Sequence, residues 1–143
     1  RTKLYCGDYT LPTNQSVCVD TKKDLQEIYG DLIGKQHTRF RAEADRAYEA
    51  GIKLIILIVD EEVKDLEGVK KWSNPRLHRY NKIKYMHEIG KWLSIPLPKK
   101  PPTDNITLYK VMSTFASKHH VEFVFCHPKD AGEKIIKLLG GEQ

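Results

Sequence analysis

Cysteine is scarce in this sequence. There are three, an odd number, and no two of them form a C-x-x-C pair. This argues against a disulfide scaffold or a cysteine-rich zinc domain. Cys18 and Cys126 lie in strand-like runs and are expected to be small buried side chains, as is usual for a protein of a reducing compartment.

Several other signatures are also missing. No apolar run approaches the length of a membrane span, and no signal peptide is recognisable. There is no P-loop, no G-x-G-x-x-G and no G-x-S-x-G. His119, His120 and His127 lack further ligands at zinc-site spacing, so we expect them to be surface or cap residues.

The length and composition of the sequence are those of one folded domain. Its 143 residues are 40% hydrophobic and 30% charged, which is ordinary globular composition with enough chain for one core. The net charge is +5. That modest excess permits a phosphate-rich partner without proving one.

The most informative stretch runs from Gly7 to Lys22. We expect a strand over Lys3–Cys6 that ends at Asp8, a turn rich in Pro, Thr, Asn and Gln, and a second strand over Ser16–Asp20. Side chains alternate along a strand, so Asp20 and Lys22 share a face. Asp8 lies opposite them if the two strands pair as a hairpin.

This pattern suggests a chemistry. Asp8 and Asp20 offer the oxygen ligands that Mg²⁺ prefers. Lys22 could orient a metal-activated water or pair with a phosphate. The spacing is weak evidence by itself, and the alternative is two turn aspartates beside a surface lysine.

The rest of the chain alternates helical and strand-like segments. Leu54–Val59 is a continuous apolar run, expected to be a central strand buried on both faces. This order predicts an α/β fold with a mixed or parallel sheet covered by helices. The other expected elements are helices over 24–33, 36–50, 79–93 and 106–119, a strand over 121–126, and a helix from Pro128.

Two of these helices are predicted with particular inward faces. In the helix over 36–50 the core stripe includes Tyr48, and in the helix over 79–93 it includes Ile83, Met86, Ile89 and Leu93.

Basic residues gather in two places. Lys35, His37 and Arg39 open the helix over 36–50, and Lys82 and Lys84 lie on the helix over 79–93. We interpret both groups as DNA contacts. For the helix over 36–50 the alternative is a solvated, salt-bridged face, which we prefer for Arg46. For the helix over 79–93 the alternative is a basic amphipathic helix packed on its own domain. A proline-rich connector over 96–102 is expected to be a loop, with a PxxP ligand as the alternative.

Ordered blocks along the chain resemble the XPF-type nucleases of the PD-(D/E)XK superfamily. The likeness covers most of the chain apart from roughly residues 61–104. The blocks that carry it are Gly7-Asp8-Tyr9, Val19-Asp20-Thr21-Lys22, Gly34 to Phe40, the strand over 54–59, and Phe123 to Pro128.

The resemblance implies a restriction-endonuclease-like single domain over 1–143, with a basic, proline-rich insertion at about 61–104. It implies catalysis by Asp8, Asp20 and Lys22, with Mg²⁺ or Mn²⁺ on the two aspartates. The implied function is structure-specific cleavage of branched, flap or junction DNA, by a homodimer in the cytoplasm of a bacterial or phage-infected cell.

The sequence also departs from this family. Asp20 and Thr21 stand where Glu and Arg are usual, and Gln26 stands where a further Asp is frequent. The family's acidic opening strand has no counterpart before Arg1, so a fragment is expected. The helix-hairpin-helix module that often accompanies the family is absent from the sequence. The alternative function is therefore a DNA-binding module on the same fold, with weakened or lost catalysis.

Overall fold

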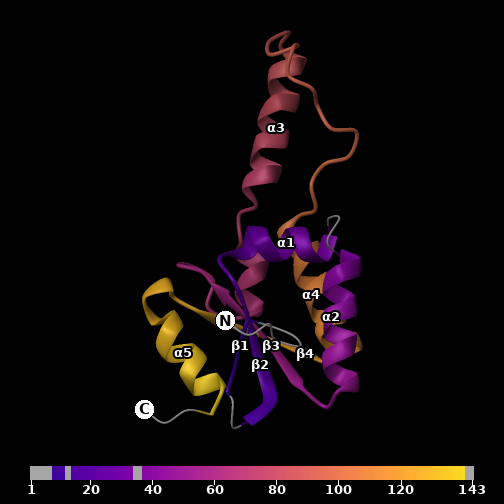
Figure 1. Ribbon diagram of the computed structural model, residues 1–143. Coiled ribbons are helices and arrows are strands. Elements are labelled where there is room, and N and C mark those ends of the chain that lie inside the picture. Colours follow the sequence, from indigo (N-terminus) through magenta and orange to yellow (C-terminus); the bar gives the residue numbers. More distant parts are fainter. Residues whose placement is uncertain (1–7, 12–13, 34–36, 141–143) are drawn as a thin grey trace.

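The computed structural model describes residues 8–11, 14–33 and 37–140. One mixed sheet runs through it in the order β1-β2-β3-β4 (Figure 1). Strand β1 pairs with β2 in antiparallel fashion, while β2–β3 and β3–β4 are parallel. Helices flank the sheet, so the predicted α/β class is confirmed. The strands are β1 (Tyr9–Leu11), β2 (Asn14–Lys22), β3 (Lys53–Val59) and β4 (Val121–Cys126). The helices are α1 (Leu25–Ile33), α2 (His37–Glu49), η1 (Glu67–Lys71), α3 (Pro75–Glu88), α4 (Asn105–His119), η2 (Pro128–Asp130) and α5 (Ala131–Leu138).

The apolar run predicted as a central strand is β3. Its residues Leu54 to Ile58 are each at most 3% exposed. Parallel neighbours lie on both edges, and helices cover both faces, so these five side chains are buried whichever way they point, and Val59 at the end of the strand is partly buried.

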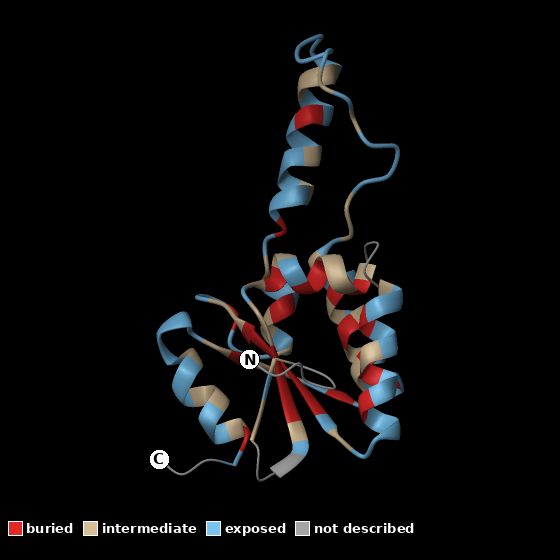
Figure 2. Ribbon diagram, viewed as in Figure 1, coloured by how far each residue is buried: buried red, intermediate tan, exposed pale blue. Residues whose placement is uncertain are grey.

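The two faces of the sheet carry separate apolar clusters (Figure 2). Cys18, Ile56 and Ile58 pack with α1, α2 and α4, whereas Val19 and Leu57 pack against the end of α5. The predicted alternation along β2 is therefore confirmed. It places Asp20 and Lys22 on the face covered by α1 and α2.

The first hairpin differs from the prediction. Residues 3–6 lie outside the described residues, but Tyr9–Leu11, which we expected to be in a turn, form β1. Cross-strand hydrogen bonds hold this segment: the Asp8 N–H donates to the Val19 carbonyl (2.9 Å) and Thr10 Oγ1 donates to the Val17 carbonyl (3.0 Å). Pairing with β2 thus outweighs the local turn preference.

Residues 75–103 form an arm that projects from the domain. Helix α3 leads outward and the following chain returns alongside it to α4 (Figure 1). Ile83 is the buried residue of α3, as predicted, but Ile89 is 47% and Leu93 69% exposed. The prediction that these two face inward is wrong, because no other element within the described residues covers this end of the arm. The helix also begins earlier than expected, at Pro75, where the Asn74 side chain accepts a hydrogen bond from the Arg76 N–H (3.0 Å).

Both ends of the arm are fastened to α1 through Tyr29. The Thr103 N–H donates to the Tyr29 hydroxyl (2.9 Å), and the Arg76 guanidinium lies 5.3 Å from the centre of the Tyr29 ring. The two ends also bind each other, since Asn74 Nδ2 donates to the Thr103 carbonyl (2.9 Å). The root of the arm is therefore held in place by specific contacts, even though its tip is exposed.

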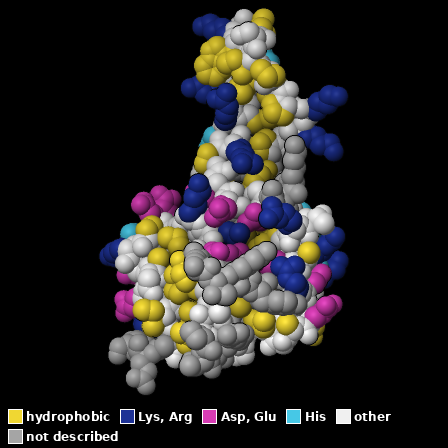
Figure 3. Space-filling model, in the orientation of Figure 1, with side chains coloured by type: hydrophobic (Ala, Val, Ile, Leu, Met, Phe, Trp, Pro, Cys, Tyr) yellow, Lys and Arg dark blue, Asp and Glu magenta, His cyan; other side chains and the backbone are white. Residues whose placement is uncertain are grey.

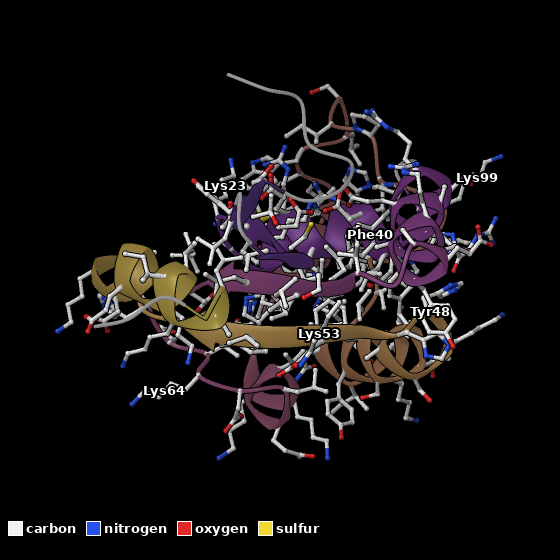
Figure 4. The ribbon with its side chains drawn as sticks, turned by 60° about the horizontal axis from the view of Figure 1, so that its bottom comes forward. Lys23, Phe40, Tyr48, Lys53, Lys64 and Lys99 are labelled. Atoms are coloured by element: carbon white, nitrogen blue, oxygen red, sulfur yellow. The ribbon has the colours of Figure 1, made fainter. Side chains whose placement is uncertain are left out.

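Two smaller predictions need correction. Tyr48, predicted in the core stripe of α2, is 57% exposed and stacks on His120 with ring centres 3.8 Å apart. Figure 4 shows Tyr48 at the periphery and Phe40 in the interior. His119, predicted to be a surface or cap residue, is buried in the last turn of α4 and hydrogen-bonds Asp45 through Nδ1 (2.8 Å). No helix in the described ranges is long and apolar enough to cross a membrane.

Candidate active site

The structure brings Asp8, Asp20 and Lys22 together at the carboxyl end of β2. Asp20 and Lys22 lie opposite Ile56 and Ile58 of β3, on the face covered by α1 and α2. Asp8 precedes β1, and its backbone N–H bonds the Val19 carbonyl, which sets its side chain beside the end of β2. The pairing of β1 with β2 therefore brings the three residues together, although the strand predicted over residues 3–6 lies outside the described residues.

Asp8 is fixed by hydrogen bonds to β2. Its Oδ2 accepts from the backbone N–H of Thr21 (3.2 Å) and from Thr21 Oγ1 (3.0 Å). Its carboxyl group is also hydrogen-bonded to that of Asp20. Two carboxyl groups in such contact cannot both ionise readily unless a proton or a cation lies between them.

The environment of Asp20 favours its protonated form. Burial, above all, raises the pKa of Asp20 from its usual 3.8 to about 7. The Lys22 ammonium acts in the opposite direction, while the negative charges of Glu43 and Asp8 raise the pKa further. Near neutral pH this carboxyl group therefore holds its proton far more readily than an ordinary aspartate, and a bound cation would displace that proton.

Lys22 is held between two carboxylates. Its Nζ lies 3.3 Å from Asp20 Oδ2 and 2.8 Å from Asp31 Oδ2, and all three side chains are largely buried. Burial alone would lower the pKa of Lys22, but the hydrogen bond and charge of Asp31 together with the charge of Asp20 outweigh it and raise the pKa. Lys22 is consequently a fixed ammonium group rather than a mobile surface lysine.

Asp31 is a site residue that sequence reasoning missed. It comes from α1, whose buried side chains are Leu25, Ile28, Tyr29 and Leu32. Asp31 follows Ile28 by three residues, so it borders the inward stripe of the helix. A carboxylate at the edge of an apolar stripe was the available signal. The acids at the start of α1, Asp24 and Glu27, belong instead to its N-terminal cap: Asp24 accepts from the Glu27 N–H (3.0 Å).

A polar cavity of about 300 Å³ opens beside this cluster. Arg39 lies on it, as its predicted phosphate-binding role requires. Arg46, which we expected to be only a salt-bridged surface residue, lies on it as well, and so does Glu43 of the same helix. The cavity wall consists of Asp20, Lys22, Asp31, Arg39, Phe40, Glu43 and Arg46.

The other predicted DNA-binding residues lie elsewhere. Lys35 is outside the described residues. His37 lines a separate cavity between α2 and α4, where its ring is 6.5 Å from that of Phe115. Lys82 and Lys84 are exposed on the arm. Of the four that lie within the described residues, Arg39 is therefore the one at the cavity.

The pair Asp8 and Asp20 fits a magnesium ion only in an open site. Within residues 8–11, 14–33 and 37–140, no three Asp, Glu, His or Cys side chains are arranged to hold a metal. Magnesium commonly takes one or two carboxylates and completes its shell with water and substrate phosphate. Two carboxyl groups in contact beside a polar cavity are compatible with that mode of binding.

Comparison with known proteins gives no relative: no family model, curated protein or solved structure matches the chain.

Proposed function

We propose that this chain is a metal-dependent DNA endonuclease of the XPF type, with a restriction-endonuclease-like fold. The proposal rests above all on the contact between Asp8 and Asp20, with Lys22 Nζ 3.3 Å from Asp20 Oδ2. Two carboxylates and an ammonium group at the end of one strand are the groups that metal-assisted phosphodiester hydrolysis requires.

Asp8 and Asp20 would hold Mg²⁺ or Mn²⁺. Bound there, the ion would supply an activated water and a positive charge beside the phosphoryl oxygen. The chain contributes the rest: Thr21 fixes the Asp8 carboxylate, and burial keeps the Asp20 carboxyl group ready to exchange its proton for a cation.

Lys22 would orient the attacking water or offset the charge that develops on the phosphate. Such an interaction accelerates the reaction only if it is stronger in the transition state than in the ground state. Asp31 serves this role indirectly. Its carboxylate, 2.8 Å from Lys22 Nζ, keeps the ammonium charged and in place. Lys22 is thus the proposed catalytic group and Asp31 a positioning residue.

The substrate would be DNA, with a preference for branched, flap or junction structures. Arg39 and Arg46 at the cavity, and Lys82 and Lys84 on the arm, would contact its phosphates. Homodimerisation and a place in the cytoplasm of a bacterial or phage-infected cell belong to the same proposal and follow from the resemblance alone.

One observation favours the alternative, a DNA-binding module that has lost catalysis. Asp31 engages the Lys22 ammonium more closely than Asp20 does, at 2.8 Å against 3.3 Å. A lysine held that way is less available to a substrate. Metal binding separates the two functions: the module would bind DNA with no Mg²⁺-dependent change at Asp8 and Asp20.

The test is cleavage of branched and linear DNA with Mg²⁺ or Mn²⁺ by Asp8→Asn protein. The asparagine side chain keeps an oxygen that can accept the hydrogen bonds of Thr21, so the hairpin should survive. We expect metal-dependent cleavage to be lost and DNA binding to be retained. Asp24→Asn is the matched control, because Asn caps a helix as well as Asp does. Full activity in Asp8→Asn would remove Asp8 from the site.

A further inference from the structure

The tip of the arm exposes apolar and aromatic side chains that nothing in the described structure covers. Tyr85 is 59%, Ile89 47%, Trp92 39% and Leu93 69% exposed. Figure 3 shows hydrophobic side chains on the arm among lysine and arginine side chains. One lysine is already paired with an aromatic ring here, since Lys82 Nζ lies 5.5 Å from the centre of the Trp92 ring.

The tip has a defined backbone. Helix α3 ends in a Schellman motif around Gly90: the Gly90 N–H donates to the His87 carbonyl (3.0 Å) and the Lys91 N–H to the Met86 carbonyl (2.8 Å). Gly90 has a φ of 77°, which glycine adopts without strain. Tyr85 near the end of α3 and Trp92 just after this turn therefore both project from a defined backbone.

His87 completes the turn. Its Nε2 lies 3.0 Å from the Trp92 carbonyl and 2.8 Å from the Ile95 carbonyl. Both partners are acceptors, so Nε2 carries the proton. This contact holds the chain after Trp92 against α3 and fixes the position from which the indole projects.

The arm also accounts for all of the net positive charge of the protein. Residues 75–103 contain seven of the 24 Lys and Arg residues but only one of the 19 Asp and Glu residues. The arm is therefore +6 and the remainder of the chain −1. Helix α3 alone is about 20 Å long. Figure 3 shows Lys and Arg side chains at intervals from the tip down to the domain, so the positive charge extends along a line.

We propose that the tip of the arm binds unpaired bases of a nucleic acid, which stack on Trp92 and Tyr85 while Lys82, Lys84 and Lys91 contact the flanking phosphates. Exposed aromatic rings interleaved with cations are the means by which proteins hold single strands. The proposal deepens the proposed function, on which it rests for the nature of the substrate: it assigns single-stranded segments to the tip and leaves cleavage to Asp8, Asp20 and Lys22.

Two other partners explain less of the arm. An anionic membrane would account for basic and apolar groups at the tip but not for the basic residues that continue to its root, such as Arg76 and Arg79. A second copy of the chain would bring one +6 arm against another, or against a remainder of charge −1. A linear polyanion with exposed bases matches both the charge along the arm and the rings at its end.

The test uses Trp92 as its own reporter. Trp72→Phe leaves Trp92 as the single tryptophan. Trp72 packs against the core and not on the tip, so its replacement should not alter the tip. The protein is titrated with oligothymidylate and with duplex DNA of equal length, in EDTA so that no cutting occurs. Trp92 emission reports stacking, and anisotropy of labelled DNA reports total binding.

We expect oligothymidylate to quench Trp92 and duplex DNA to leave it nearly unchanged. Trp92→Ala should weaken single-strand binding roughly tenfold, because stacking of one base contributes about that factor. Tyr85→Ala should act in the same direction. Tyr48→Ala is the matched control, since Tyr48 is as exposed as Tyr85, at 57% against 59%, but lies on α2. It should leave binding unchanged.

Several other outcomes would overturn the proposal, each for a different reason, and one would overturn only the nuclease. Binding to oligothymidylate without quenching, or equal losses on single and double strands in Trp92→Ala, would show that only charge acts. A Trp92 blue shift with anionic vesicles and none with DNA would indicate a membrane surface, and dissociation of a dimer in Trp92→Ala would indicate a second copy. Quenching that is selective for single strands, in a protein that never cleaves DNA with Mg²⁺, would keep this proposal and overturn the nuclease.

Discussion

Asp20→Asn is predicted to stabilise the metal-free protein at pH 8. In the folded chain Asp20 holds a proton that the unfolded chain releases, because burial and nearby carboxylates raise its pKa from 3.8 to about 7. Between those two pH values the folded state binds more protons, so the free energy of unfolding falls as pH rises. Well above about pH 7 Asp20 is ionised in both the folded and the unfolded chain, and the free energy of unfolding falls no further on its account.

The size of the effect follows from the shift. Each pKa unit corresponds to about 1.4 kcal/mol. A difference of roughly three units between the folded and unfolded chain therefore lowers the free energy of unfolding by about 4 kcal/mol between about pH 4 and pH 8. Asparagine resembles protonated aspartic acid and can donate a hydrogen bond to Asp8 as the acid does. Asp20→Asn should therefore recover up to about 4 kcal/mol at about pH 8 and little at about pH 4, a large change for a domain of ordinary stability.

The assay is urea unfolding of wild type and Asp20→Asn at pH 4, 6 and 8. The difference between the two proteins cancels the titration of other groups, including the six histidines. Glu49→Gln, an equal change of charge at the exposed end of α2, serves as control. With Mg²⁺ at about a hundred times its dissociation constant, wild type should gain about 2.7 kcal/mol and Asp20→Asn much less. Parallel stability curves for the two proteins across this pH range would refute the reasoning.

Four further predictions concern the site, the arm and the core. Lys22→Ala should slow single-turnover cleavage about a hundredfold with little change in DNA affinity, the scale seen when one well-placed electrostatic group is removed. Lys22→Arg should rescue it only in part, and wild-type kinetics in Lys22→Ala would leave Lys22 a structural residue. Asp31→Asn should lower the cleavage rate about tenfold and also lower the pKa of Lys22, seen as a shifted pH–rate profile; an unchanged profile would separate Asp31 from catalysis. Lys82→Ala with Lys84→Ala should reduce the salt slope of log K on duplex DNA by roughly 0.9 for each lost contact, against no change in Lys64→Ala, an exposed lysine outside the arm. Ile56→Ala should cost about 3 to 4 kcal/mol in urea unfolding, because Ile56 is fully buried in the central strand.

Local pattern was sufficient for most of the sheet and for the core of the site. The apolar run of β3 predicts a central strand, since a short series of consecutive apolar residues between polar ends is buried on both faces of a sheet. The strict alternation of β2 likewise fixes which side chains accompany Asp20, because a strand turns each residue to the opposite face.

The separation of His37 from Arg39 could have been anticipated from the sequence. Both are predicted DNA contacts on one helix, yet residues two apart on a helix do not face each other. The structure separates them accordingly, with Arg39 at the polar cavity and His37 in the other cavity.

Other features depended on contacts between distant segments. Asp31 belongs to the site only because α1 packs against the end of β2, and Tyr9–Leu11 became a strand because β2 offers hydrogen-bond partners. Ile89 and Leu93 follow a helical spacing that predicts burial, but periodicity describes one face of a helix and not what covers it. On the arm no other described element reaches that face. Sequence pattern alone specifies which side chains share a face, whereas the packing of distant segments selects the faces that are covered, because burial is a property of two surfaces in contact.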